Sequence, residues 1–202
     1  MPHFTDLTGL AGIASATAAA VQLLPGMTKL VKTRPAWLPL AVFFMMLIPF
    51  GTMPLAAYVR GVTGDLSITT LVLVWCALSR PWRERNTVGP KHRLELLAVI
   101  ALAAFVLYPM ALGVGAYDTY RLGYSDPLFV AALLVISLVA WFRGSALLAS
   151  SIALAALAWA SGWYESDNLW DYLLDPFVSI YALATIMICA ARSVGKSRQV
   201  DS

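Results

Sequence analysis

The sequence predicts an all-α membrane protein with a single domain, residues 1–202, built as a bundle of about seven transmembrane helices. The chain is 60% hydrophobic and only 12% charged, with a mean hydropathy of +0.75. A soluble domain carries about 25% charged residues. Apolar segments long enough to cross the hydrocarbon layer recur along the whole chain. Because backbone groups in lipid must be paired within a segment, each span is predicted to be a helix.

The first four predicted spans cover residues 7–30, 37–58, 64–80 and 94–115. The first is the weakest, since it is rich in alanine and is bent or ended near Pro25. The second contains Pro39, Pro49 and Pro54, which predict kinks in one helix. The third is short and opens with Gly64-Asp65-Leu66-Ser67, which predicts a helix cap. The fourth is a continuous apolar run that ends near two glycines.

The last three predicted spans cover residues 127–142, 145–163 and 171–191. Only Arg143, Gly144 and Ser145 join the fifth span to the sixth. So short a linker predicts a tight antiparallel helix hairpin. The seventh span opens at Asp171, and Asp175 follows four residues later on what is expected to be the same helix face.

The distribution of charge predicts the orientation of the bundle. With the amino terminus outside, 12 of the 14 basic residues face the cytoplasm and 8 of the 11 acidic residues face outward. This matches the excess of Lys and Arg that cytoplasmic loops carry. The predicted inner basic residues are Lys29, Lys32, Arg34, Arg80, Arg83, Arg85, Lys91, Arg93, Arg143, Arg192, Lys196 and Arg198. We therefore expect a multi-pass protein of the inner (plasma) membrane, with its carboxyl terminus in the cytoplasm.

Several functional classes are disfavoured by what the sequence contains. The inner basic residues are explained by topology, so no nucleic-acid partner is expected. Both histidines, His3 and His92, lie outside the predicted spans, which argues against haem held at membrane depth. The cysteines form no metal-binding spacing, and no metal site or cofactor is expected. The first residues carry no basic segment, so we also expect no cleaved signal peptide.

The outward loops carry the candidate binding residues. They are rich in acids, tyrosine and tryptophan, which interfacial aromatic belts and helix capping explain without any function. Ionisable groups that enter the membrane are nevertheless functional candidates. We expect a vestibule on this face, and its candidate substrate-binding residues are Arg60, Asp65, Ser67, Arg121, Asp171 and Asp175. No catalytic residue can be assigned.

Three functions fit these observations. The first is a small transporter or lipid flippase that uses the outer vestibule. The second is a non-catalytic membrane subunit that anchors a partner enzyme, as the short loops and the lack of catalytic motifs suggest. The third is a membrane enzyme that modifies a lipid-linked substrate at the outer leaflet, with a carboxylate as general acid and an arginine as a clamp. The expected partners are membrane lipids, together with another membrane protein or a second copy of the chain.

Overall fold

A computed structural model describes residues 4–23, 37–79 and 89–200, and it confirms that the protein is mostly helical, with 78% of residues in helices. The described residues form nine α-helices, namely α1 Phe4–Leu23, α3 Trp37–Leu47, α4 Leu55–Thr63, α5 Ile68–Leu78, α6 Pro90–Ala111, α7 Pro127–Phe142, α8 Ala146–Ala160, α9 Leu169–Leu173 and α10 Pro176–Val200. A short 3-10 helix, η2, covers Tyr120–Gly123. The end of the first predicted span and the inner basic residues Lys29, Lys32, Arg34, Arg80, Arg83 and Arg85 lie outside the described residues.

The predicted second span is not one kinked helix. Helix α3 ends at Leu47, and two short antiparallel strands follow, β1 Pro49–Phe50 and β2 Met53–Pro54. Gly51 turns the hairpin with a φ of +73°. Proline has no backbone N–H to donate and restricts the residue before it, so the two prolines here end one helix and precede the next rather than bend a single helix.

The predicted seventh span is also interrupted. Helix α9 ends at Leu173, Leu174 is extended with φ −134° and ψ 142°, and α10 begins at Pro176. The residue before a proline disfavours the helical region, which explains why the break falls here. Asp171 and Asp175 therefore lie on two different helices, and the expected shared face does not form.

The predicted hairpin between the fifth and sixth spans is confirmed. Helices α7 and α8 pack against each other, and the turn between them places Gly144 at a φ of +77°. The Ser137 hydroxyl on α7 donates a hydrogen bond of 3.1 Å to the Ala149 carbonyl on α8. Asp126 caps the start of α7 by accepting from the backbone N–H groups of Leu128 and Phe129.

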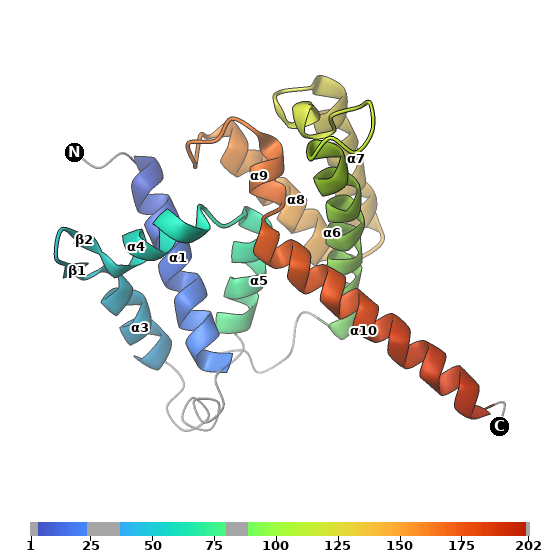
Figure 1. Ribbon diagram of the computed structural model, residues 1–202, viewed down its shortest axis with the longest axis horizontal. Coiled ribbons are helices and arrows are strands. Elements are labelled where there is room, and N and C mark those ends of the chain that lie inside the picture. Colours follow the sequence, from blue (N-terminus) through green and yellow to red (C-terminus); the bar gives the residue numbers. More distant parts are fainter. Residues whose placement is uncertain (1–3, 24–36, 80–88, 201–202) are drawn as a thin grey trace.

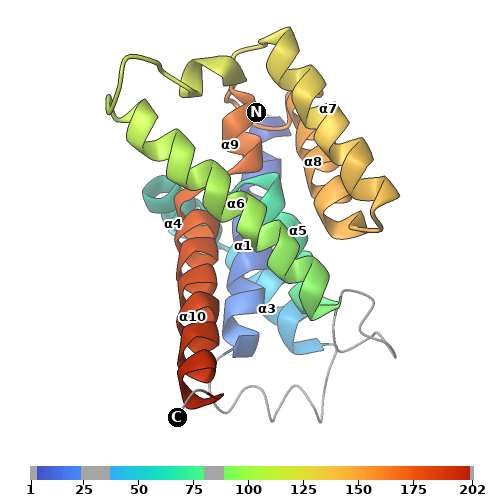
Figure 2. The same ribbon diagram turned by 90° about the vertical axis from the view of Figure 1, so that its right-hand side faces the viewer.

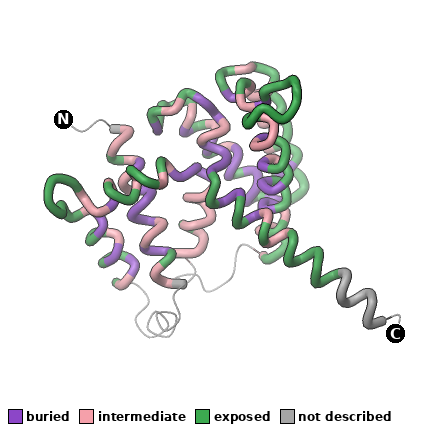
Figure 3. The backbone as a smooth tube through the Cα atoms, in the orientation of Figure 1, coloured by how far each residue is buried: buried purple, intermediate pink, exposed green. Residues whose placement is uncertain are grey.

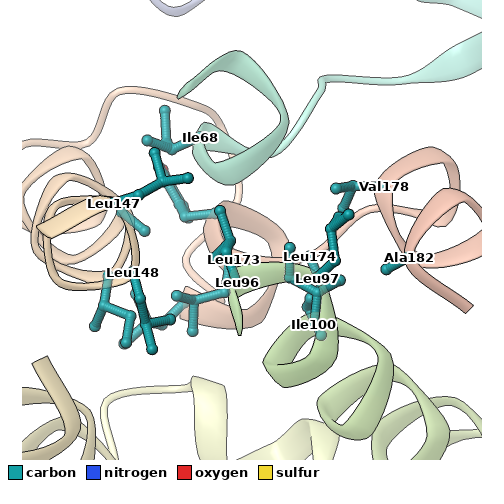
Figure 4. Close-up of a cluster of buried hydrophobic side chains, with 14 of the residues drawn as sticks. Ile68, Leu96, Leu97, Ile100, Leu147, Leu148, Leu173, Leu174, Val178 and Ala182 are labelled. Atoms are coloured by element: carbon teal, nitrogen blue, oxygen red, sulfur yellow. The ribbon is translucent and has the colours of Figure 1, made fainter. Parts of the chain in front are cut away.

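Two hydrophobic clusters hold the helices together. The larger one joins the helices from α5 to α10, and Figure 4 shows leucine, isoleucine and valine side chains from it. The smaller one joins α1, α3 and α4 with Leu66 in the loop before α5. Figure 3 shows the buried residues along the facing sides of the helices and exposed residues along the outer sides and on α10.

Two of the described helices, α6 and the Pro176–Ser193 part of α10, are long and apolar enough to cross a membrane. Four further apolar helices, α3, α5, α7 and α8, have only 10–17 residues. This supports a membrane association, whereas the count of seven spans stays a prediction. Figures 1 and 2 both show α9 and the start of α1 at one end of the molecule and the end of α10 at the other.

Candidate functional site

Arg60 is the centre of an ion-pair cluster that joins three elements. Its guanidinium binds Asp65 through two parallel hydrogen bonds, Nε to Oδ1 at 2.6 Å and Nη2 to Oδ2 at 2.9 Å. On its other side, Nη1 donates to Asp6 Oδ1 on α1 at 3.0 Å. The two-pronged geometry gives strength and direction, and the hydrogen bond to Asp65 raises the pKa of Arg60 further above its ordinary value. Arg60 and Asp65, both candidate binding residues, therefore bind each other, and Arg60 also anchors α1 through Asp6.

Gly9 explains how α1 comes so close to this cluster. A Cβ atom built on Gly9 would lie 2.5 Å from Arg60 Nε and would overlap Asp65 Oδ1. No real side chain tolerates such contacts, so the close approach of α1 requires glycine at this position. Gly12, one turn further along the same helix, has ordinary space, since its nearest neighbour would be Leu71 Cδ2 at 3.4 Å.

Asp175 is a buried carboxylate, only 5% exposed, at the start of α10. Its Oδ2 accepts from the Ser67 backbone N–H at 2.9 Å, from Ser67 Oγ at 2.8 Å and from Thr70 Oγ1. Its Oδ1 accepts from the Val178 backbone N–H at 2.9 Å. Ser67 and Asp175, 108 residues apart in the chain, are thus brought together.

Asp175 links two helices through its two oxygens. Three donors from Ser67 and Thr70 bind Oδ2, and the Val178 N–H binds Oδ1. Two helix starts meet at this carboxylate, because Ser67 is the N-cap of α5 and Val178 lies in the first turn of α10. The positive ends of both helix dipoles favour a negative charge at this point. Asp175 therefore joins α5 to α10, and at 5% exposure it is not open to a ligand.

Three consecutive residues of the α4–α5 loop bind three different parts of the fold. Asp65 binds Arg60, the Leu66 carbonyl accepts from Tyr164 Oη at 2.8 Å, and Ser67 binds Asp175. Burial raises the pKa of the Tyr164 hydroxyl, so it stays protonated and donates at neutral pH. This loop also lies between the two hydrophobic clusters, since Leu66 belongs to the smaller one and Ile68, at the start of α5, to the larger one.

Asp171, on α9, has a different environment from Asp175. Tyr120 Oη donates to both of its oxygens, at 2.9 and 3.0 Å, and Ser166 Oγ donates to Oδ2 at 2.5 Å. Burial, and then the bond to Asp171, raise the pKa of Tyr120. The carboxylate of Asp171 has about four acceptor positions, and only two hydroxyl groups donate to it. Within the described ranges no Lys, Arg or His pairs with Asp171, because the ion pairs found there involve only Arg60 and His92.

The loop before α9 is fixed to the η2 segment by several backbone contacts. Asn168 Nδ2 donates to the Tyr120 carbonyl at 3.0 Å, and Trp170 Nε1 donates to the Thr119 carbonyl at 3.0 Å. A Cβ at Gly123 would overlap Asn168 Oδ1 and lie 2.8 Å from Trp170 Cδ1. These contacts place Tyr120 and Asp171 on a rigid support.

A pocket of about 290 Å³ opens beside Asp171, between the end of α6, η2 and α9. Its lining residues are Leu107, Tyr108, Ala111, Tyr120, Trp170, Asp171 and Leu174. Three of them are aromatic, and Asp171 is the only charged one. The pocket thus combines a carboxylate that has spare acceptor capacity with aromatic and aliphatic walls.

A larger apolar groove of about 790 Å³ lies between α5 and α8. On α5 its lining residues recur with helical spacing along one complete face, from Ile68 to Ser79. On α8 they occupy one face of the second half, from Leu154 to Ser161, and Trp163 adds to the wall. Leucine, valine, isoleucine and tryptophan predominate, and no charged residue lines the groove.

The predicted site residues therefore separate into different environments. Arg60 and Asp65 form one cluster, Ser67 and Asp175 form another, and Asp171 lines a pocket of its own. Arg121 is exposed and forms no ion pair with any described residue. They do not form one open vestibule, because the first two clusters are occupied by protein groups.

Sequence reasoning missed the tyrosines and two glycines. Tyr120 and Tyr164 were explained as belonging to an interfacial belt, although both donate specific hydrogen bonds. Gly9 and Gly123 carried no signal beyond being glycines. Spacing cannot reveal them, because their partners lie more than 40 residues away along the chain.

The described part of the chain holds no group of three or more His, Cys, Asp or Glu residues that could bind a metal ion. Compared with models of protein families, with curated proteins and with solved structures, the chain matches none of them.

Proposed function

We propose that the chain is a seven-span protein of the inner membrane, outer terminus first, which binds a lipid in the α5–α8 groove and moves it as a small transporter or flippase. The exposed surface supports a membrane environment. Many large apolar side chains are more than half exposed on the helices, among them Phe105 at 70%, Phe142 at 84% and Met187 at 70%. Soluble proteins rarely expose contiguous apolar surface of this extent.

The groove is the observation that carries the lipid proposal. One face of α5 lines it over 11 residues, which at 1.5 Å per residue is about 16 Å. The hydrocarbon core of a bilayer is about 30 Å thick, so one leaflet accounts for about 15 Å. The groove thus has the length and the apolar lining that a single acyl chain needs.

The position of the groove favours the outer leaflet. It begins at Ile68, directly after the polar loop that holds Ser67, and Trp163 lies near the same end. Tryptophan prefers the level of the headgroups. A lipid would place its headgroup near this polar end and its chain along α5.

A reconstitution experiment tests the proposal. Liposomes that contain only this protein and a fluorescent phospholipid are treated with a membrane-impermeant quencher, which reports movement between leaflets. We expect faster movement than in protein-free liposomes. Leu157→Trp, at the groove wall, should slow it, whereas the matched variant Leu138→Trp, on the exposed surface of α7 away from the groove, should not. Movement equal to that in empty liposomes would refute transport.

One observation favours the second candidate, a non-catalytic membrane subunit. The outer charged groups Arg60, Asp65 and Asp175 bind one another or the backbone, so they act as structural links rather than as free ligand-binding groups. In that case a helix of a partner would occupy the groove. Purification in mild detergent would then recover one partner in constant proportion, and Leu157→Trp would reduce that recovery while Leu138→Trp would not.

A further inference from the structure

The pocket beside Asp171 is chemically distinct from the rest of the outer end. Among the described residues, three other carboxylates at this end bind the protein's own cations or N–H and O–H groups. Asp65 binds Arg60, Asp126 caps α7, and Asp175 accepts from four donors. Asp171 lines an open pocket and accepts only from two hydroxyl groups.

We propose that this pocket binds an organic cation, an amine or a quaternary ammonium group, with Asp171 as its counter-ion and Tyr108, Tyr120 and Trp170 as its walls. Aromatic residues grouped around a cation are the usual means of recognising choline-like groups, because the ring faces carry negative electrostatic potential. A negative charge in a partly buried site without a basic partner attracts a cation more strongly than the same charge in water does.

The size of the pocket limits the ligand to a small group. Ordinary small-molecule sites have volumes of about 300–1,000 Å³, and this pocket, at about 290 Å³, is at the lower limit. That volume suits a headgroup or a free small amine rather than an extended molecule. The aliphatic residues Leu107, Ala111 and Leu174 can contact the carbon atoms next to the charged nitrogen.

The walls of the pocket are held in place before any ligand binds. Tyr120 Oη is fixed by Asp171, and Trp170 is fixed by its bond to the Thr119 carbonyl and by the Phe129 ring, whose centroid lies 4.6 Å away. Because burial keeps the Tyr120 hydroxyl protonated, the charge of the wall comes from Asp171 alone. A preformed site loses little entropy when a ligand binds.

The inference does not depend on lipid transport, since the groove lies between α5 and α8 and the pocket between α6, η2 and α9. The same chemistry can come from a phospholipid headgroup or from a free amine. The experiment must therefore distinguish these two sources.

The first measurement compares choline with 3,3-dimethyl-1-butanol, its uncharged analogue of nearly the same shape, on the purified full chain in nanodiscs of phosphatidylglycerol. Calorimetry should show binding of choline and at least about tenfold weaker binding of the alcohol, a difference of about 1.4 kcal/mol. Equal affinity for the two would overturn the proposal, because only the charge distinguishes them.

Variants locate the site. Asp171→Asn should weaken choline binding at least about tenfold, whereas Asp167→Asn, at an exposed acid in the loop before α9, should leave it unchanged. Tyr108→Leu removes an aromatic wall whose hydroxyl makes only one long hydrogen bond, of 3.4 Å with Ser179, so this variant should fold even if Asp171→Asn does not. Unchanged choline affinity in a folded Tyr108→Leu or Asp171→Asn protein would contradict the assignment.

To test whether a lipid headgroup is the ligand, choline binding is measured again in nanodiscs of phosphatidylethanolamine. If the lipid amine occupies the pocket, choline binding is weaker there than in phosphatidylglycerol, and Asp171→Asn lowers the amount of phosphatidylethanolamine that co-purifies. If affinity is the same in both lipids, the source is a free amine. Leu157→Trp should change neither result, which separates a failure of this inference from a failure of the proposed lipid transport.

Discussion

At the scale of single residues, the same side-chain type plays two roles at the α9 end of this protein. Asp171 lies on α9, and Asp175 follows four residues later, directly before α10. Asp175 is buried and accepts from two backbone N–H groups and two hydroxyl groups. Asp171 accepts from two hydroxyl groups and borders a pocket. The number of donors that the fold brings to each carboxylate, not its residue type, decides which one can meet a ligand.

Gly9 provides the sharpest prediction at this scale. Gly9→Ala places a methyl group against the Arg60–Asp65 pair, so either the ion pair separates or α1 moves away. We expect a loss of stability of about 1–3 kcal/mol, the usual cost of adding a methyl group to an already filled space. The loss is measured by heating each variant in detergent and using size-exclusion chromatography to quantify the protein that stays folded. Gly12→Ala is the matched control, and equal melting temperatures for the two variants would contradict the role assigned to Gly9.

At the scale of elements, two of the predicted spans are each interrupted at a proline and form two helices instead of one. The α3–α4 hairpin and the α9–α10 junction both occur at prolines. At the second junction the freed N–H of Val178 is paired with Asp175, so the break leaves no unsatisfied donor at this position. Interrupted helices whose ends meet at a polar group also occur in transporters, where they bind ions or substrates. Here the meeting group belongs to the protein itself.

Asp175→Asn tests the junction. The amide keeps the shape of the side chain. Its NH2 group, however, must point either at the Val178 N–H or at the three donors around Ser67, and two donors cannot form a hydrogen bond with each other. We expect a loss of about 1–3 kcal/mol. Asp126→Asn is the control, because Asp126 uses one oxygen for both of its bonds and asparagine caps helices equally well. If thermal unfolding shows the two variants to be equally stable, Asp175 does not join α5 to α10.

At the scale of the whole molecule, the two ends differ in chemistry. Residues of η2, α4, α9 and the loops beside them form the polar networks at one end, and α10 extends away from the bundle toward the other end (Figure 1). The described basic residues Lys91, Arg93, Arg143 and Arg192 all lie near the predicted inner ends of their helices. This separation supports the proposed orientation.

Reporter fusions test the orientation directly. Alkaline phosphatase, which is active only outside the cytoplasm, should be active when fused after Tyr117, between α6 and η2, and inactive when fused after Arg143, between α7 and α8. Green fluorescent protein at the carboxyl terminus should fluoresce, because it folds in the cytoplasm. The opposite pattern at any of these positions would reject the proposed topology.

The sequence by itself determined the helical class and the α7–α8 hairpin, because these depend on composition and on linker length. It also indicated a helix cap within residues 64–67 and named Arg60 and Asp65 as candidate site residues. Only the tertiary structure decided that Asp175 binds Ser67, Thr70 and Val178, that Gly9 admits α1 to the ion-pair cluster, and that Asp171 lines a pocket with Tyr108 and Tyr120. These contacts join residues far apart in the chain, and no local pattern records which donors the packing of helices will bring to a given carboxylate.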